Sequence, residues 1–263
     1  MSVDLAPGSR SVEAPDASLI EETIAGAAAL YRPAGRFAYF FARGKLRGDT
    51  LFATLLRVGA IPDGAHVVDL GCGQGLVGAW FTAAHRGRRD GSAGRPHWSG
   101  ASYCGVDQST RDVARARVAL PEARIIEADL RRFDVATLGP CDVITLLDLL
   151  HYLEPAVQVR VLRGAHAALR ETGALILCVG DAASAGASHR ANAIDRAVCA
   201  LRGHPRAVLH RRSIGAWIAL LLDIGFDIEI LEDDRGNACS PHKRTAFANV
   251  LLRARKRSPG SRQ

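Results

Sequence analysis

The sequence of 263 residues has no long apolar run, no internal repeat and no apolar core at its amino end. A helix needs about 20 mainly apolar residues to cross a bilayer, so we expect no membrane span. Residues 1–17 contain charges and prolines where a signal peptide would have an apolar stretch. This composition predicts a cytoplasmic protein with a disordered amino end.

The cysteines do not form a metal-binding or disulfide pattern. There are six, and no two are spaced as C-x-x-C. Four of them lie on or beside predicted strands, where a thiol behaves as a small hydrophobic group. The pattern predicts no metal site and fits a reducing cytoplasm. The cysteines are at positions 72, 104, 141, 178, 199 and 239.

Acidic residues are absent from residues 253–263, which contain five of the basic residues. Removing those five charges from the formal net charge of +7 leaves +2, an ordinary balance. Such a tail is either a solvated, disordered end or a contact for RNA or an anionic surface. We therefore do not expect a nucleic-acid partner, although an RNA- or protein-directed activity that uses the tail stays as the alternative.

The most informative segment is residues 66–75, where a short apolar run ends in alternate glycines. Val67 and Val68 predict a buried strand, and residues 76–84 predict a helix. Glycines at 71, 73 and 75 allow a tight turn whose N–H groups approach a ligand. The positive end of the helix dipole points at the same place. The segment therefore predicts a cradle for a nucleotide-like cofactor.

Two registers of this turn point to different cofactors. The dinucleotide pattern G-x-G-x-x-G fits Gly73, Gly75 and Gly78, but it leaves Gly71 unexplained and lacks the acid about 20 residues further on. The pattern D-x-G-x-G-x-G instead resembles the first motif of the class I S-adenosylmethionine (SAM) dependent methyltransferases. In that family the turn runs beside the methionine part of the cofactor. The resemblance implies that the cofactor is bordered by Asp69, Gly71, Cys72, Gly73 and Gly75.

Acids also follow the next three predicted strands, at residues 101–107, 123–128 and 142–147. One carboxylate can accept hydrogen bonds from both hydroxyls of a ribose. In the family the acid after the second strand binds the ribose, the third-strand acid and its neighbour meet the adenine amino group, and the fourth-strand segment lines the pocket. The resemblance thus adds these cofactor residues: Asp107, Gln108, Asp129, Leu130 and Asp148.

Each acid also has a structural alternative. Asp69 could cap the glycine turn, Asp107 could cap the helix over 109–119, and Asp129 could cap the turn after it. Ser109 serves as well as Asp107 for that cap. The joint occurrence of the acids after successive strands favours the cofactor interpretation.

Strands alternate with helical patterns, which predicts an α/β domain with a mostly parallel sheet. A helix over 155–170, ended by Gly173, leads to a strand at 174–180. A helix over 213–224 precedes strands at 226–231 and 245–252. The family resemblance implies a seven-stranded, mostly parallel Rossmann-like methyltransferase sheet with helices on both faces and an antiparallel C-terminal hairpin.

The expected domain organisation has a methyltransferase domain at its centre. We predict disorder over 1–17, an N-terminal helical lid over 18–47, the SAM-binding domain over 48–255 and a basic disordered tail over 256–263. Residues 181–212 are expected to form a cap inserted into the domain.

Five aromatic residues lie among basic residues in the segment 31–49. They suggest a lid over the acceptor, and the alternative is that the rings pack the helix on the sheet edge. The candidate substrate residues are Tyr31, Arg36, Tyr39 and Tyr152.

The resemblance implies transfer of a methyl group from SAM, which needs alignment, exclusion of water and at times removal of a proton. His151 is the candidate base because it follows the fourth strand, at the edge where an open sheet places its ligand. We expect the acceptor to be an oxygen or carbon of a small molecule, and the aromatic segment favours an aromatic or polyketide-like one. A non-catalytic SAM- or NAD-binding module is the second alternative.

Overall fold

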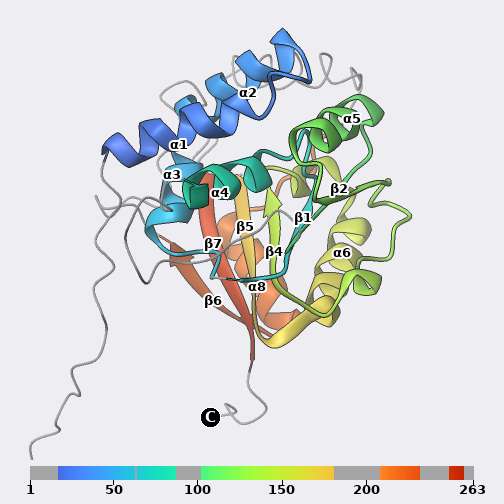
Figure 1. Cartoon of the computed structure of the whole chain (residues 1–263). Coiled ribbons are helices and arrows are strands. Elements are labelled where there is room, and N and C mark those ends of the chain that lie inside the picture. Colours follow the sequence, from blue (N-terminus) through green and yellow to red (C-terminus); the bar gives the residue numbers. More distant parts are fainter. Residues whose placement is uncertain (1–16, 63, 87–101, 181–207, 232–248, 258–263) are drawn as a thin grey trace, which may run out of the picture.

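A seven-stranded sheet forms the centre of the protein, in the order β3-β2-β1-β4-β5-β7-β6 (Figure 1). The computed structural model describes residues 17–62, 64–86, 102–180, 208–231 and 249–257. Strands β1 to β5 pair in parallel, whereas β7 is antiparallel to both β5 and β6. The predicted fold is confirmed. The strands are β1 (Val67–Leu70), β2 (Tyr103–Asp107), β3 (Arg124–Glu127), β4 (Cys141–Leu147), β5 (Leu169–Gly180), β6 (Phe226–Leu231) and β7 (Asn249–Lys256).

Helices cover both faces of the sheet. One core packs α1 to α5 against the strand face that carries Val67, Val143 and Ile176, and the other packs α6 and α8 against the face that carries Ile144. The two faces alternate along each strand because strand side chains have a period of two. The helices are α1 (Ala17–Ala29), α2 (Arg36–Gly48), α3 (Thr50–Arg57), α4 (Leu76–Arg86), α5 (Thr110–Ala119), α6 (Pro155–Ala168) and α8 (Ile214–Ile224), with short 3-10 helices η2 (Val135–Leu138) and η3 (Leu150–Tyr152).

The strand order reverses between β1 and β4, which places the ligand-binding edge of the sheet. β1 has β2 on one side and β4 on the other. In open α/β sheets, ligands bind outside the carboxyl ends of the strands at such a point. Figure 1 shows α2 lying across this edge, above the end of β4.

Side-chain caps fix where several helices begin. Ser109 accepts a hydrogen bond from the Asp112 N–H at the start of α5, and Ser213 accepts one from Ala216 at the start of α8. Asp49 caps α3 in the same way, through the Leu51 N–H. Caps of this kind satisfy N–H groups that lack a partner within the helix. The predicted helices at 109–119 and 213–224 are confirmed.

The structure corrects the predicted end of the helix over 155–170. α6 ends at Ala168 and Leu169 already begins β5, where it pairs with Cys141. Gly173 therefore lies inside a strand. A side chain there would lie 3.0 Å from the carbonyl oxygens of Arg170 and Asp142, so glycine permits close approach of the two strands at a register shift.

The last strand extends beyond the end predicted for it at residue 252, and residues 245–248 of that prediction lie outside the described residues. β7 runs from Asn249 to Lys256 because it completes a long antiparallel ladder with β5. Its basic residues consequently belong to the sheet: Arg253 pairs with Glu229 at 3.1 Å and Lys256 with Glu171 at 3.2 Å. Arg257, just after the strand, pairs with Asp227 at 3.1 Å.

Some predicted segments lie outside the described residues. They are the disordered amino end up to residue 16, the cap insertion up to residue 207, and the tail from residue 258. None of the helices in the described ranges combines the length and apolar character needed to cross a bilayer.

Gly225 ends α8 in the left-handed region, with φ of 109°, and its N–H bonds to the carbonyls of Leu221 and Leu222. An L-residue in this region costs about 1–2 kcal/mol. We expect Gly225→Ala to lower the free energy of unfolding by that amount in urea titrations. Gly215→Ala, in the same helix with no atom within 4 Å of the added methyl group, is the control and should be neutral or stabilising. Equal effects of both changes would contradict the role of the left-handed cap.

Candidate functional site

The turn between β1 and α4 depends on three glycines. Gly71, Gly73 and Gly75 have φ of 78°, 54° and 80°, a region that L side chains rarely adopt. A side chain at Gly71 would lie 2.8 Å from Leu149, whereas at Gly73 nothing lies within 4 Å. The Gly71 and Cys72 N–H groups donate to Val106 O at 2.8 and 3.1 Å, which ties the turn to β2. The turn therefore packs closely at Gly71 and is open at Gly73.

Asp69 points into the sheet. Its carboxylate accepts hydrogen bonds of 2.6 Å from the Tyr103 hydroxyl of β2 and from the Thr145 hydroxyl of β4. The residue is only 3% exposed. Burial raises the pKa of Asp69 to about 6, against the effect of the two hydroxyl donors. Asp69 thus joins β1 to β2 and β4 directly below the turn, and its expected place beside the cofactor stays a prediction.

Asp107 connects the end of β2 to the glycine turn. One carboxylate oxygen accepts from the Gly73 N–H and the other from the Ser109 N–H, both at 2.8 Å. At the start of α5, Asp107 therefore accepts a hydrogen bond from the N–H of Ser109, and Ser109 itself caps the helix. A carboxylate has about four lone-pair sites, so each oxygen keeps capacity for a further donor. This geometry fits two neighbouring hydroxyls of a ribose.

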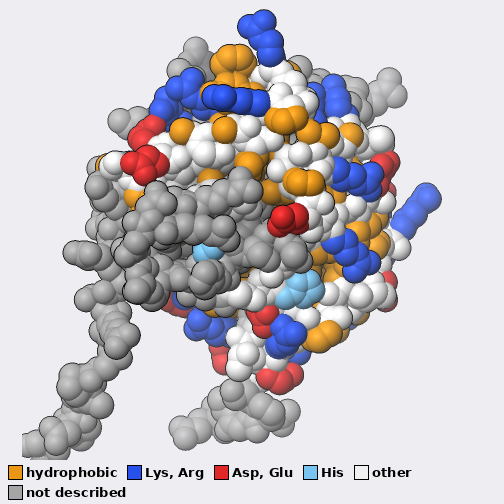
Figure 2. All heavy atoms as spheres, viewed as in Figure 1, with side chains coloured by type: hydrophobic (Ala, Val, Ile, Leu, Met, Phe, Trp, Pro, Cys, Tyr) orange, Lys and Arg blue, Asp and Glu red, His pale blue; other side chains and the backbone are white. Residues whose placement is uncertain are grey.

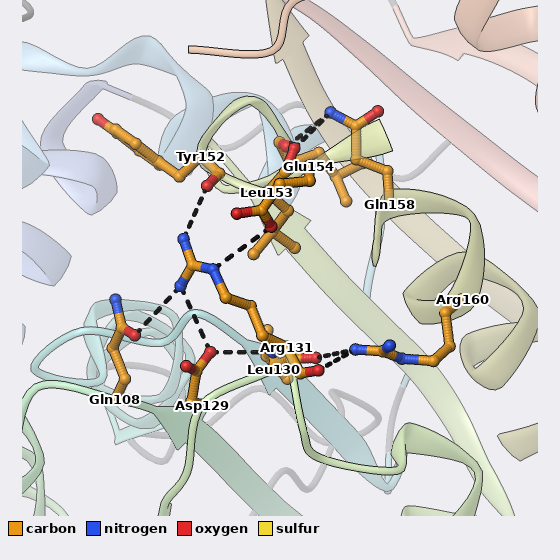
Figure 3. A network of polar contacts seen from close by, with 10 residues as sticks. Gln108, Asp129, Leu130, Arg131, Tyr152, Leu153, Glu154, Gln158 and Arg160 are labelled. Atoms are coloured by element: carbon orange, nitrogen blue, oxygen red, sulfur yellow. Dashed lines mark hydrogen bonds and ion pairs between the residues drawn. The ribbon is translucent and has the colours of Figure 1, made fainter. Parts of the chain in front are cut away.

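A guanidinium group joins the ends of β2, β3 and β4 (Figure 3). Arg131 donates to Gln108 Oε1 at 3.5 Å, to Asp129 Oδ1 at 3.4 Å and to Tyr152 O at 3.1 Å. Its Nε lies 3.4 Å from Glu154 Oε2. The network brings together Gln108 and Asp129, two of the predicted cofactor residues. The sequence did not single out Arg131, whose only signal was its place two residues after Asp129.

Leu130 lies beside this network but faces away from it. Its side chain is buried in the core beneath α6. Its carbonyl accepts from Arg160 Nη2 at 3.3 Å, and Arg160 also donates to the carbonyl of Arg131. The packing of the Leu130 side chain therefore does not support the predicted contact with a cofactor, which stays a prediction.

The end of β4 carries a second polar group, in which a lysine of α2 meets two acids. Lys45 Nζ lies 2.7 Å from Asp49 Oδ2 and 3.6 Å from Asp148 Oδ2. Burial lowers the pKa of Lys45, but the charges of Asp49 and Asp148 outweigh it, so the pKa is raised and the ammonium persists. Asp148 has φ of 54°, unusual for a residue other than glycine, and accepts from Cys178 Sγ at 3.4 Å.

Lys45 was missed at the sequence level. The signal available was its rarity, since it is one of only three lysines and lies in the predicted lid segment.

His151 and Tyr152 lie in η3, directly after β4. Their rings are in contact, with centroids 4.1 Å apart. Gln158 of α6 positions this segment, because its buried side-chain amide donates to Leu150 O, Leu153 O and His210 O at 2.9–3.0 Å. Gln158 was also missed, although a glutamine next to the apolar stripe of a helix was a signal.

The predicted lid residues separate into buried and exposed groups. Tyr31 is fully buried and donates to the Gln74 carbonyl at 2.8 Å, so its hydroxyl serves the glycine turn. Tyr39 is half-buried beneath Arg32, whose guanidinium lies 5.5 Å from the ring centroid, and Arg36 is exposed. A contact of these side chains or of Tyr152 with the acceptor stays a prediction.

Gln74, in the turn itself, has one buried polar atom without a protein partner. Its amide nitrogen donates to Ala38 O at 3.2 Å, whereas Oε1 is buried and has no hydrogen bond. An unpaired buried acceptor is costly unless a ligand or water satisfies it.

No cluster of three or more histidine, cysteine or acidic side chains that could hold a metal occurs within the described ranges. The described cysteines, Cys72, Cys104, Cys141 and Cys178, are buried free thiols.

Residues 68–175 match a family model described as a methyltransferase domain. Two curated proteins are similar over part of the chain. Carboxy-S-adenosyl-L-methionine synthase of Chromohalobacter salexigens is 38% identical over 120 residues, which is 43% of this chain and 39% of that protein. Trans-aconitate 2-methyltransferase of Enterobacter sp. is 38% identical over 81 residues, 31% of this chain and 27% of that protein. The chain thus matches well under half the length of these relatives.

Solved structures share the fold at low sequence identity. A TehB-like SAM-dependent methyltransferase from Corynebacterium glutamicum superposes with a TM-score of 0.51 and 18% identity, over 78% of this chain and 86% of that one. Magnesium protoporphyrin IX methyltransferase from Synechocystis, solved with S-adenosylhomocysteine, gives a TM-score of 0.50 and 16% identity, over 82% and 87% of the two chains.

Residues 68–175 therefore belong to a methyltransferase domain, and the chain has the Rossmann-like fold of class I SAM-dependent methyltransferases, whose cofactor is SAM. The predicted methyltransferase recognition is confirmed, whereas the register of the glycine turn stays a prediction. The site fits the cofactor, because Gly73 is open, Asp107 retains acceptor capacity and Gln74 Oε1 lacks a partner. Asp107 would hold the ribose, and the segment 71–75 would border the methionine part.

The raised pKa of Asp69 makes stability depend on pH. The pKa of Asp69 is about 6 in the folded protein, which is above its value in the unfolded chain. Its contribution to the free energy of unfolding is therefore fully present below about pH 4 and is lost as the pH rises through about 6. We expect the stability advantage of the unmodified protein over Asp69→Asn to shrink by about 2–3 kcal/mol between pH 4 and 7. Urea unfolding of both proteins across this range measures the difference.

Asp142→Asn is the opposing control. Burial raises the pKa of Asp142, but the His66 N–H and Arg170 outweigh burial and hold this pKa below its ordinary value. Its stabilising contribution should therefore appear as the pH rises. A pH-independent difference for Asp69→Asn would contradict the assignment of a buried, titrating carboxylate.

Asp107→Asn should weaken SAM binding, measured by calorimetry, by about tenfold or more, since a hydrogen bond to a charged group contributes about 1.5–3 kcal/mol. The control is Asp134→Asn, which alters an acid that caps η2 away from the site. Unchanged affinity in Asp107→Asn, or binding of NAD in place of SAM, would refute the assigned role.

Proposed function

We propose that the chain transfers the methyl group of SAM to an oxygen or carbon of a small-molecule acceptor located where β4 ends. The observation that carries the proposal is the Lys45–Asp148 pair, which joins α2 to this edge of the sheet at 3.6 Å. It lies near the point where the strand order reverses, next to the glycine turn that borders SAM.

The work left to the protein is positioning and proton handling. When bound, SAM supplies a methyl group already activated on a sulfonium sulfur. Lys45, held as a cation by two acids, would stabilise the oxyanion of an ionised acceptor. His151 or Asp148, on the segment after β4, would accept the proton that the acceptor loses. Gln158 keeps that segment in place through the carbonyls of Leu150 and Leu153.

The cation favours acceptors with an acidic oxygen, such as phenols, enols and carboxylic acids. One partial relative is named for trans-aconitate, a carboxylic acid. The aromatic or polyketide-like acceptor expected from the sequence belongs to the same group. Its support now comes from Tyr39 and Tyr152 rather than from the whole aromatic segment, because Phe37, Phe40 and Phe41 are exposed.

Two alternatives are less well supported. An RNA- or protein-directed activity was expected to use the basic tail, but Arg253, Lys256 and Arg257 are paired with acids of the same sheet. A non-catalytic SAM-binding module would not need Lys45 beside the site. The buried free thiols are consistent with the proposed cytoplasmic location.

The test is a screen with methyl-labelled SAM against a panel of phenols, enols and carboxylic acids. With an acceptor in hand, Lys45→Met should lower kcat by about tenfold or more, since electrostatic groups of this kind contribute about 2–4 kcal/mol. SAM affinity should not change. The matched control is Arg43→Met, an exposed position on the same helix.

Three results would overturn the proposal. The first is transfer to RNA or protein with none to small molecules, and the second is SAM binding without any turnover in cell extract. The third is a Lys45→Met enzyme with unchanged kcat.

A further inference from the structure

Helix α2 packs its small side chains inward and exposes its large ones. Ala38 and Ala42 are fully buried, whereas Phe37, Phe40 and Phe41 are 62%, 55% and 39% exposed. Residues three and four apart share one face of a helix, so the three rings form a single exposed stripe. Figure 2 shows hydrophobic and basic side chains side by side over α2, at the top of the molecule.

This stripe is unlike the scattered hydrophobic residues found on any protein surface. Full burial of one phenylalanine side chain stabilises a protein by about 1.5–3 kcal/mol. The three rings on this face are not fully buried, so much of this stabilisation is absent. Phe37 and Phe41 are stacked with ring centroids 6.0 Å apart, and Phe40 lies edge-on to Tyr39 with centroids 5.0 Å apart. A contiguous apolar stripe with a polar border is typical of an interaction site.

The border of the stripe is cationic. α2 contains no acidic residue and carries exposed arginines at 36, 43 and 47. The Arg115 guanidinium of α5 lies 4.6 Å from the Phe37 ring centroid and is paired with Asp112 at 3.0 Å. Arg47 is paired with Glu21 of α1. The surface therefore favours a partner that is both anionic and apolar.

We propose that this face of α2, formed by Phe37, Phe40 and Phe41 with Arg36 and Arg43, docks on the surface of an anionic lipid bilayer. Helices with aromatic residues on one face and arginines beside them lie in the interface between headgroups and acyl chains. The rings would enter this boundary and the guanidinium groups would bind lipid phosphates.

Two other occupants fit the surface less well. A second copy of the chain, related by a two-fold axis, would bring identical cationic borders together. A single-stranded nucleic acid needs free ring faces along a groove, but the Phe37 ring already contacts Phe41 and Arg115.

The docked orientation has a consequence for the site. α2 also carries Lys45, which reaches Asp148, and Ala38, whose carbonyl accepts from the glycine turn. Docking would thus hold the ligand-binding edge of the sheet next to the bilayer. The inference does not depend on the acceptor or on catalysis.

The test is flotation of the full chain with vesicles made of equal parts phosphatidylcholine and phosphatidylglycerol, and with vesicles of phosphatidylcholine alone. We expect binding to the anionic vesicles that falls about tenfold or more in Phe37→Ser/Phe40→Ser/Phe41→Ser. Arg36→Glu/Arg43→Glu should lower it by about fivefold per arginine. Leu222→Ser/Ile230→Ser, which changes exposed apolar residues on α8 and β6, should bind as the unmodified protein does.

Thermal unfolding of each variant confirms that it is folded, and Phe40→Ser alone replaces the triple variant if that one is not. The proposal is overturned if the chain ignores anionic vesicles or if the control variant loses binding equally. It is also overturned if the phenylalanine changes instead abolish a dimer in sedimentation velocity or binding to an RNA oligonucleotide.

Discussion

The backbone of the glycine turn has to leave β1 and reverse into α4 beside the last residues of β2, and the rest of the site depends on this constraint. Val106 O accepts two N–H groups of the turn, and the Asp107 carboxylate accepts a third from Gly73. Below them, Asp69 ties β1 to Tyr103 and Thr145 on the neighbouring strands. Asp107 and Asp69 thus hold this edge of the sheet from two sides, at the place where the cofactor is expected.

The acids that follow β2, β3 and β4 are balanced in different ways. Asp107 has backbone N–H groups as partners, Asp129 has Arg131, and Asp148 has Lys45. Both cations come from outside the strands, so each also fastens another element to the sheet edge. Arg131 holds the segment after β4 through Tyr152 O, and Lys45 holds α2. The contacts that neutralise the acids therefore also position the neighbouring elements.

The sequence sufficed for features that local chemistry determines. Alternate glycines, strand-end acids and caps such as Ser109 act within a few residues, and the structure has them where they were predicted. Lys45, Arg131 and Gln158 escaped prediction because each also has a partner far along the chain, on an element whose neighbours are set only by the strand order. These distant partners are Asp148, Gln108 and His210. The extent of β7 was misplaced for the same reason, since its pairing with β5 decides where it ends.

The orientation of α2 shows a further limit of sequence patterns. Aromatic residues usually mark the buried face of a helix, which is why the segment resembled a lid. Here the alanines are buried instead, because Ala38 O must come within hydrogen-bond distance of Gln74 in the glycine turn, and close approach of a helix backbone needs small side chains. Once the alanines take the inner face, the helical period forces Phe37, Phe40 and Phe41 outward. The contact that closes the turn therefore also creates the exposed aromatic surface.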